Sequence, residues 1–348
     1  MKSAKFALVL ILGLVLVAGV FAGGGGQKPA GDGGAAATPA ATPTKLTICG
    51  TNGPGDTQSM AHEEFAKRLN ALGGWNADAK VSSEMGSTDD VTEQGINGAP
   101  VIAASDPSRI AVYVPEIGIL MMHYLLSEYS QLDNLMETPL YKEWTQKLRA
   151  KGIVLLTNNC LTGWRHWVTN KVIKVPADLA GLKIRTMGNP IALNSVEAMG
   201  AVPIAMAQDQ AYHAISTKVV DGGEWQLPTV YSSKFYEVCK NISLSRHFLL
   251  TGSIVCGTAW FDKLSPTQQK QLSDNAVKTY KDNQELVIKY EQEYLDEMRT
   301  KYGVAVEENP DRKAFQQASA HLYADPKTSQ GADYQALRTE LYKQLGIN

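Results

Sequence analysis

Two arginines lie where they could bind a carboxylate. Arg185 ends the short apolar segment 183–185 (KIR), and Arg165 lies between two tryptophans in the segment 162–170 (TGWRHWVTN). A guanidinium presents a planar fork of N–H donors that matches a carboxylate with two parallel hydrogen bonds. At the carboxyl end of a parallel strand, such a side chain points into the crevice where α/β proteins bind ligands. The alternative for each arginine is a surface ion pair, which the apolar strand before Arg185 disfavours.

The sequence lacks the motifs of the common hydrolases. There is no GxSxG nucleophile elbow, and the segment 62–66 (HEEFA) lacks the second histidine of an HExxH zinc site. The glycine-rich turn 50–55 matches neither a Walker loop nor GxGxxG, although it directs a helix N-terminus toward the ligand-binding edge of a sheet. With a formal net charge of −2, the chain lacks the basic footprint of a nucleic-acid-binding protein. These observations predict a binding protein that is not an enzyme and has no nucleic-acid partner.

The four cysteines form no CxxC pair, which argues against a thiolate zinc site. Their even number permits disulfides, but the sequence does not give the pairing; they are Cys49, Cys160, Cys239 and Cys256.

The N-terminus has the pattern of an export signal. Lys2 and Lys5 precede an uncharged apolar run that ends near Ala22, so residues 1–22 are predicted to be a secretory signal peptide. An uncleaved membrane anchor is the alternative, since the run is at the short limit for a spanning helix. Residues 23–44 contain mainly Gly, Ala, Pro and Thr and are predicted to form a flexible leader. The expected location is the periplasm.

Strand and helix patterns alternate along the rest of the chain. With 348 residues, 44% of them hydrophobic, the chain can form a sizeable core and two domains. The predicted elements are a strand at 45–49, a helix at 59–72, a strand that begins at 80–82, a helix at 88–96 and strands at 101–104, 153–156 and 183–185, followed by a helix at 191–199. This alternation predicts a parallel α/β sheet.

One predicted helix is too long for a single small domain. Ser265 and Pro266 form a helix start, and neither Gly nor Pro occurs between Thr267 and Tyr302. A helix of about 35 residues would be about 50 Å long. Its apolar positions do not keep a strict heptad, so a strut across two domains is favoured over a coiled coil.

An ordered set of motifs resembles the periplasmic solute-binding subunit of TRAP (tripartite ATP-independent periplasmic) transporters, the DctP-type family. The resemblance covers nearly all of residues 45–345. The motifs are VPE at 114–116, GWR at 163–165, TN at 169–170, PADLAGLKIR at 176–185, GAVP at 200–203, QAY at 210–212, VDGGE at 220–224 and KFYEV at 234–238. As an ordered set they are highly specific, although no single motif is.

The resemblance implies an α/β, two-lobed periplasmic-binding-protein fold with hinge strands and a long helix that bridges both lobes. The implied lobe boundaries are 45–161 plus about 251–285 for lobe I, and 162–250 plus about 286–345 for lobe II. It also implies a function: the protein captures a small organic acid between the lobes by hinge closure and delivers it to a membrane permease. A periplasmic sensor that signals to a membrane receptor and a secreted α/β enzyme are the alternatives. A monomer is expected, but the sequence does not decide the oligomeric state.

The resemblance also assigns ligand-facing residues. Arg185 resembles the main carboxylate-binding arginine of the family and Arg165 its second one. Polar contacts from the first lobe are expected at Asn52 and at Asp106, for which a helix N-cap is an equal alternative. The remaining expected contacts are Gln208, Glu224, Trp225 and Gln226.

Two of these positions depart from the common family pattern. Many members have Asn after the DGxE run, where this chain has Trp225, and an aromatic where it has Gln208. A Glu-Trp pair resembles the branch that binds small 2-keto or 2-hydroxy acids with a metal ion, so Glu224 could help to hold a cation that accompanies the ligand; no other cofactor is expected. Trp225 could stack on the ligand or pack in the core, with equal support for each.

Overall fold

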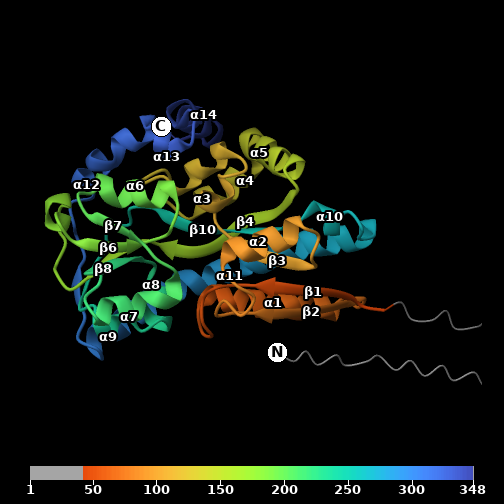
Figure 1. Ribbon diagram of the computed structural model, residues 1–348, viewed down its shortest axis with the longest axis horizontal. Coiled ribbons are helices and arrows are strands. Elements are labelled where there is room, and N and C mark those ends of the chain that lie inside the picture. Colours follow the sequence, from red (N-terminus) through yellow and green to blue (C-terminus); the bar gives the residue numbers. More distant parts are fainter. Residues whose placement is uncertain (1–41, 348) are drawn as a thin grey trace, which may run out of the picture. The chain divides into compact units, whose positions relative to one another are not determined.

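The computed structural model describes residues 42–347. The predicted signal peptide (1–22) and all but the end of the predicted leader (23–44) lie outside the described residues. Among residues 42–347, no helix combines the length and the apolar character needed to cross a membrane. Two separate β-sheets organise this part of the chain, one in each lobe (Figure 1). The predicted two-lobed α/β fold is confirmed.

The first lobe contains a five-stranded sheet with the order β2-β1-β3-β10-β4. Its strands are β1 (Thr44–Cys49), β2 (Trp75–Lys80), β3 (Val101–Ser105), β4 (Ile153–Trp164) and β10 (Leu249–Gly257). The first three strands are parallel, as predicted, whereas β10 is antiparallel to both β3 and β4. The prediction of a parallel sheet is therefore wrong for β10 alone, because β4 runs in the same direction as β1, β2 and β3. The strand expected to begin at 80–82 is also wrong, because β2 ends at Lys80.

Helices cover this sheet: α1 (Thr57–Ala71), α2 (Thr88–Ile96), α3 (Pro107–Ile110), the 3-10 helix η1 (Pro115–Met121), α4 (Ser130–Glu137), α5 (Pro139–Ala150) and α10 (Thr258–Phe261). The predicted helix at 88–96 is confirmed to the residue, since Ser87 forms a capping box with Asp90 at its start.

The second lobe contains a six-stranded sheet with the order β11-β9-β5-β8-β6-β7. Its strands are β5 (His166–Thr169), β6 (Lys183–Thr186), β7 (Val202–Ala205), β8 (Gly222–Trp225), β9 (Asn241–Ser243) and β11 (Ala305–Glu307). Its helices are η2 (Pro176–Leu179), α6 (Pro190–Ala198), η3 (Gln208–Gln210), α7 (Ala211–Ser216), α8 (Leu227–Ser232) and α9 (Phe235–Val238).

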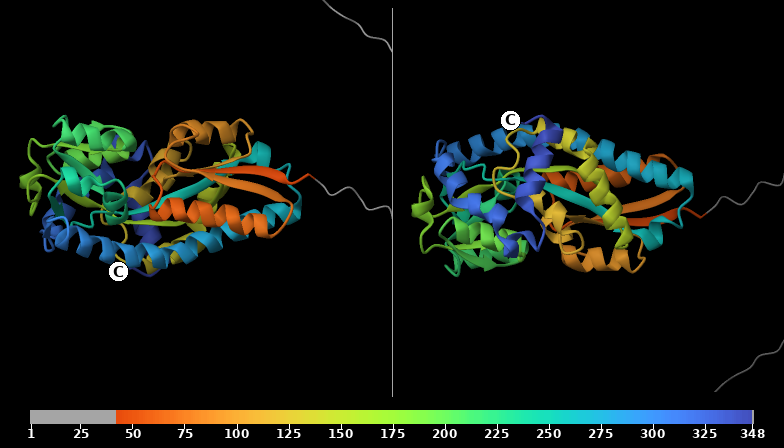
Figure 2. Two further views of the ribbon diagram at one scale, coloured as in Figure 1. Left: turned by 90° about the horizontal axis from the view of Figure 1, so that it is seen from below. Right: turned by 90° about the horizontal axis from the view of Figure 1, so that it is seen from above.

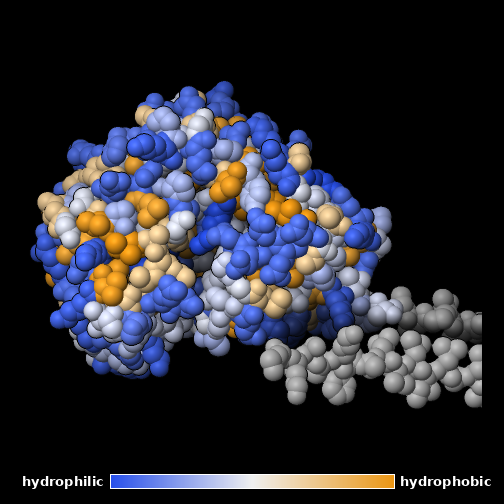
Figure 3. Space-filling model, viewed as in Figure 1, coloured by the Kyte–Doolittle hydropathy of each residue, from blue (hydrophilic) through white to orange (hydrophobic). Residues whose placement is uncertain are grey.

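The edge strand of this second sheet is partly uncovered. Hydrophobic residues gather over β6 and β7 on the face seen in Figure 3, and Val202 of β7 is 46% exposed. Pro203 lies within β7 and has no N–H group to donate. A proline on an edge strand limits pairing with a further strand.

Two chain segments connect the lobes side by side. Arg165 alone separates β4 of the first sheet from β5 of the second, and residues 244–248 lead back from β9 to β10. The Arg165 N–H donates to the Phe248 carbonyl oxygen at 3.0 Å, so the two crossing segments are hydrogen-bonded to each other. These two crossing segments form the hinge region.

The helix α11 (Pro266–Thr300) is the predicted strut, and its 35 residues are confirmed. It packs against α1 and β4 of the first lobe and against α8 of the second, and Figure 2 shows it running along both lobes. The chain ends with α12 (Arg312–Ser319), η4 (Ala320–Ala324), α13 (Pro326–Ser329) and α14 (Tyr334–Leu345). Because α14 packs on η1 and α4, the last helix is better grouped with the first lobe; the lobe boundaries otherwise stay a prediction.

All four cysteines are buried and free rather than paired. They serve as small apolar groups in the cores of the lobes. Trp164 and Trp167 are likewise buried, at 4% and 0% exposure.

A glycine at the hinge makes room for a carboxylate from α11. Glu291 accepts a hydrogen bond from the Trp164 backbone N–H at 3.0 Å and another from the Tyr129 hydroxyl. Gly163 has φ +121°, and a Cβ there would lie 2.5 Å from Glu291 Oε1. Any side chain at position 163 would therefore displace the carboxylate that fixes the strut to the crossing strand.

We predict that Gly163→Ala lowers the free energy of unfolding by about 3 kcal/mol. About 1–2 kcal/mol follows from the positive φ, and the rest from the disturbed hydrogen bonds of Glu291. Urea denaturation measures the change. Gly181→Ala is the matched control, because Gly181 has φ +75° but nothing within 4 Å of the added Cβ. Equal losses in the two variants would contradict the steric role of Glu291.

Candidate functional site

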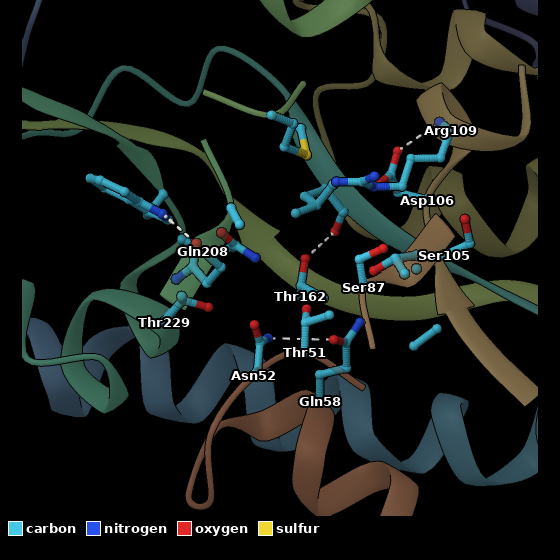
Figure 4. Close-up of a pocket in the computed structure, with 18 of the residues that line it drawn as sticks. Thr51, Asn52, Gln58, Ser87, Ser105, Asp106, Arg109, Thr162, Gln208 and Thr229 are labelled. Carbon is cyan, nitrogen blue, oxygen red and sulfur yellow. Dashed lines mark hydrogen bonds and ion pairs between the residues drawn. The ribbon is translucent and has the colours of Figure 1, made fainter. Parts of the chain in front are cut away.

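A cavity lies between the two lobes, with about 820 Å³ of atom-free space that includes its opening to solvent. Both sheets and the hinge contribute to its walls (Figure 4). The polar residues that line it are Thr51, Asn52, Gln58, Ser83, Ser87, Thr88, Ser105, Asp106, Arg109, Thr162, Arg165, Arg185, Gln208, Asp209, Trp225, Gln226, Thr229 and Thr251.

Arg185 reaches the cavity from β6 and has no carboxylate partner. The residue is only 4% exposed, and its Nε donates to the Met206 carbonyl oxygen at 3.0 Å. Its guanidinium carbon lies 5.5 Å from the centre of the Trp225 ring. Among the described residues, its two terminal nitrogens have no hydrogen-bond partner. Burial, and then the nearby charge of Arg165, lower the pKa of Arg185 to about 9, so the guanidinium is a desolvated cation at neutral pH.

Arg165, in contrast, is already paired. Its Nε donates to the Glu224 carboxylate, and a terminal nitrogen donates to the Glu224 carbonyl oxygen. Glu224 also accepts from the Thr186 hydroxyl at 2.8 Å. Burial opposes the ionisation of Glu224, but the charge of Arg165 and the hydrogen bonds from His247 and Arg165 together outweigh burial and lower the pKa of Glu224 to about 2. The pair is therefore ionic, and it leaves Arg185 as the uncompensated charge.

Three buried histidines surround this ion pair. His247 Nε2 lies 3.5 Å from Glu224 Oε2, and the Trp167 ring stacks on His247 at 4.5 Å. Burial lowers the pKa values of His123, His166 and His247. Neutral imidazoles add no charge at neutral pH, so the net charge of the site is set by its arginines and carboxylates.

The first-lobe wall is polar, and its Asp106 shares the guanidinium of Arg109 with Asp89, which lies outside the cavity lining. Asp106 N-caps α3 through the N–H groups of Ser108 at 2.9 Å and Arg109 at 3.1 Å. Arg109 Nε lies 3.1 Å from Asp106, and its terminal nitrogen lies 2.5 Å from Asp89. The Ser105 hydroxyl is buried in the wall without a hydrogen-bond partner. Two carboxylates thus share one guanidinium, next to a free hydroxyl.

Side-chain amides lie along the other edges of the cavity. Asn52 Nδ2 is 3.4 Å from Gln58 Oε1 in the first lobe. Gln208 Oε1 accepts from Trp225 Nε1 at 2.9 Å in the second lobe. Trp225 is 1% exposed, so its indole is a buried wall that also holds an amide in place.

The chain has clear relatives. The profile of the bacterial extracellular solute-binding protein family 7 (DctP) matches residues 49–329. The chain belongs to this family, the solute-binding proteins of TRAP transporters.

Individual relatives support the assignment. The 2,3-diketo-L-gulonate-binding periplasmic protein of Escherichia coli K12 is 30% identical over 74% of this chain and 76% of its own length. The fold matches that of a TRAP solute-binding protein from Actinobacillus succinogenes with bound L-galactonate, with a TM-score of 0.82, 27% identity and coverage of 87% of this chain and 99% of the other. An apo open structure from Escherichia fergusonii has a lower TM-score of 0.74 at 26% identity, with coverage of 85% and 99%.

In this TRAP solute-binding protein, the cavity brings together seven of the eight residues predicted from the sequence: Asn52, Asp106, Arg165, Arg185, Gln208, Trp225 and Gln226. Glu224 does not line the cavity but lies beside it, bound to Arg165. This arrangement favours a charge-balancing role for Glu224 over cation binding. Within residues 42–347, no three His, Cys, Asp or Glu side chains are grouped so that they could hold a metal ion.

Other wall residues were not predicted. Gln58 and Thr229 lie at helix starts, and Thr162 lies in a strand that the sequence pattern made too short. Arg109 could have been found, since it follows Asp106 by three residues across a predicted helix start.

We predict that Glu224→Gln lowers the free energy of unfolding by about 3–5 kcal/mol at neutral pH, because Arg165 loses a buried counter-ion. The sign of the pH dependence follows from the lowered pKa. The carboxylate contributes stability above its ordinary pKa of 4.5, and this is lost as the pH falls toward about 2.

The difference in the free energy of unfolding between wild type and Glu224→Gln should therefore decrease by about 3 kcal/mol between pH 5 and pH 2, as measured by urea denaturation. Glu143→Gln on the exposed face of α5 is the control. A difference in unfolding free energy that stays constant across this pH range would show that Glu224 is not ionised next to Arg165.

Proposed function

We propose that the protein captures a small organic acid in the interlobe cavity, closes around it, and delivers it to the membrane permease of a TRAP transporter. The observation that supports this most directly is Arg185, a buried guanidinium with no carboxylate partner among the described residues. A bound carboxylate would supply the missing counter-charge and accept two parallel hydrogen bonds.

Closure follows from the distribution of the ligand contacts. The proposed carboxylate site is on the second lobe, whereas Asn52, Gln58 and Asp106 belong to the first lobe. A ligand that contacts both walls binds more tightly when the lobes are together, and this difference in affinity drives the equilibrium toward the closed state.

The wall opposite Arg185 favours a hydroxylated monocarboxylate. Asp106, Ser105 and the amide groups offer acceptors and donors for hydroxyls, while the carboxylate of Asp106, which shares its Arg109 partner with Asp89, opposes a second carboxylate. The bound L-galactonate and the 2,3-diketo-L-gulonate specificity of the two relatives described above agree with a sugar acid.

The proposed location is the periplasm. The predicted signal peptide at 1–22 and the extracellular family description support it. The family consists of binding proteins, which supports a role without catalysis.

We predict that the mature chain binds an acid from a panel of sugar acids, mono- and dicarboxylates, sulfonates and phosphate esters, and that Arg185→Ala abolishes this binding. Removing one partner of a buried charge pair costs about 3–5 kcal/mol, or roughly two to three decades or more in affinity. Thermal shift with and without calcium identifies the acid, and calorimetry measures the affinity.

Arg299→Ala is the matched control, because Arg299 lies at the far end of α11 and pairs with Glu308 on the surface. Arg185→Lys should bind with intermediate affinity, since an ammonium keeps the charge but loses the fork. Wild-type affinity in Arg185→Ala would refute the assigned role.

We predict that Asp106→Asn shifts selectivity toward dicarboxylates. Asn keeps the N-cap of α3 but removes the charge that opposes a second carboxylate. In calorimetry, the affinity ratio of galactarate (two carboxylates) to galactonate (one) should rise roughly tenfold relative to wild type. An unchanged ratio would show that Asp106 acts only as a cap.

A further inference from the structure

Asp56 is a buried carboxylate at the boundary between the lobes. It N-caps α1 and is 1% exposed. Its Oδ1 accepts from the Gln58 backbone N–H at 2.9 Å and from Asn52 Nδ2 at 3.0 Å, both in the first lobe. One carboxylate oxygen is therefore sufficient for the helix cap and for holding Asn52.

The second oxygen contacts only the other lobe. Asp56 Oδ2 accepts from the Thr229 hydroxyl at 3.0 Å and from the Ser232 hydroxyl at 3.2 Å, and both belong to α8. No charged group is among the causes that act on the pKa of Asp56: burial raises it, and the surrounding hydrogen bonds oppose the rise. Two hydroxyls of the second lobe thus take the place of both water and a cation at this oxygen.

This contact adjoins the cavity. Asn52 and Gln58, which surround Asp56, and Thr229, which donates to it, all line the cavity wall. Figure 4 shows these three side chains along the same edge of the pocket. A ligand that orders Asn52 and Gln58 also fixes the carboxylate that receives the hydroxyls of α8.

We infer that Asp56 is a positioning residue that stabilises the closed arrangement of the lobes by accepting hydrogen bonds from the Thr229 and Ser232 hydroxyls of α8. We call this contact the latch. The inference rests on the proposed function, since a latch has a role only if the lobes open and close. When the lobes separate, water replaces the two hydroxyls at Oδ2 at little cost. When they close, this oxygen loses its water, and bonds from neutral donors to a carboxylate offset the loss.

The latch is tested with Ser232→Ala, because Ser232 is not among the residues that line the cavity. The probe is L-galactonate. We expect its dissociation constant to rise roughly tenfold, the effect of losing a hydrogen bond to a charged group. Pulsed EPR between spin labels on exposed positions of α2 and α7 should show a shift toward longer interlobe distances, with and without the probe. The melting temperature of the ligand-free protein should not change.

Ser232→Thr keeps the hydroxyl and should restore both readouts. Ser216→Ala is the matched control, because the Ser216 hydroxyl bonds only within its own helix. Identical EPR distances in wild type and Ser232→Ala under both conditions would overturn the latch. That result is distinguishable from failure of the proposed function, which would appear as unchanged acid binding in Arg185→Ala.

Discussion

A buried guanidinium without a protein counter-ion is the feature on which the rest of the site depends. Taking a cation out of water costs several kcal/mol even after the surroundings relax, and Arg185 forms no ion pair among residues 42–347. The neighbouring carboxylate of Glu224 relieves this cost only in part, because it is bonded to Arg165 and not to Arg185. The second lobe thus carries a buried positive charge that an incoming anion can balance, and the first lobe supplies hydroxyls, amides and the carboxylate of Asp106 on the opposite side.

The pairing of Arg165 with Glu224 has a second consequence, because Arg165 is the single residue between β4 and β5. Its backbone bonds the returning segment at Phe248, and its side chain bonds β8. The crossing point is therefore anchored to the sheet that carries the binding arginine. Arg165 therefore belongs both to the hinge and to the charge environment of Arg185, so a motion of the hinge changes that environment.

The sequence predicts the features that depend on local pattern. The strut α11, the helix 88–96 and the arginine at the end of β6 follow from caps, periodicity and strand ends. The sequence does not predict β2, whose weakly apolar residues, Trp75–Lys80, depend on pairing with β1, or the full length of β4, where polar residues such as Asn158 and Asn159 are buried by hydrogen bonds to Ser253 and Val277. Asp56 was also missed, because its significance arises from contacts with residues 173 and 176 positions away.

The lobes meet on two sides of the cavity, and the two contacts differ in chemistry. On one side, Met187, Ile191 and Ala192 of the second lobe share a hydrophobic core with Ile110 and Ile117 of the first. On the other side, the contact includes the hydrogen bonds between Asp56 and the hydroxyls of α8. Figure 1 shows α6 near α3 at one side of the molecule and α8 and α1 at the other. Separating apolar side chains exposes their area to water at about 25 cal/mol per Å². Separating the polar contact exchanges hydrogen bonds with water at much lower net cost. The polar side is therefore the side that opens at the lower free-energy cost, so a small latch there can control access to Arg185.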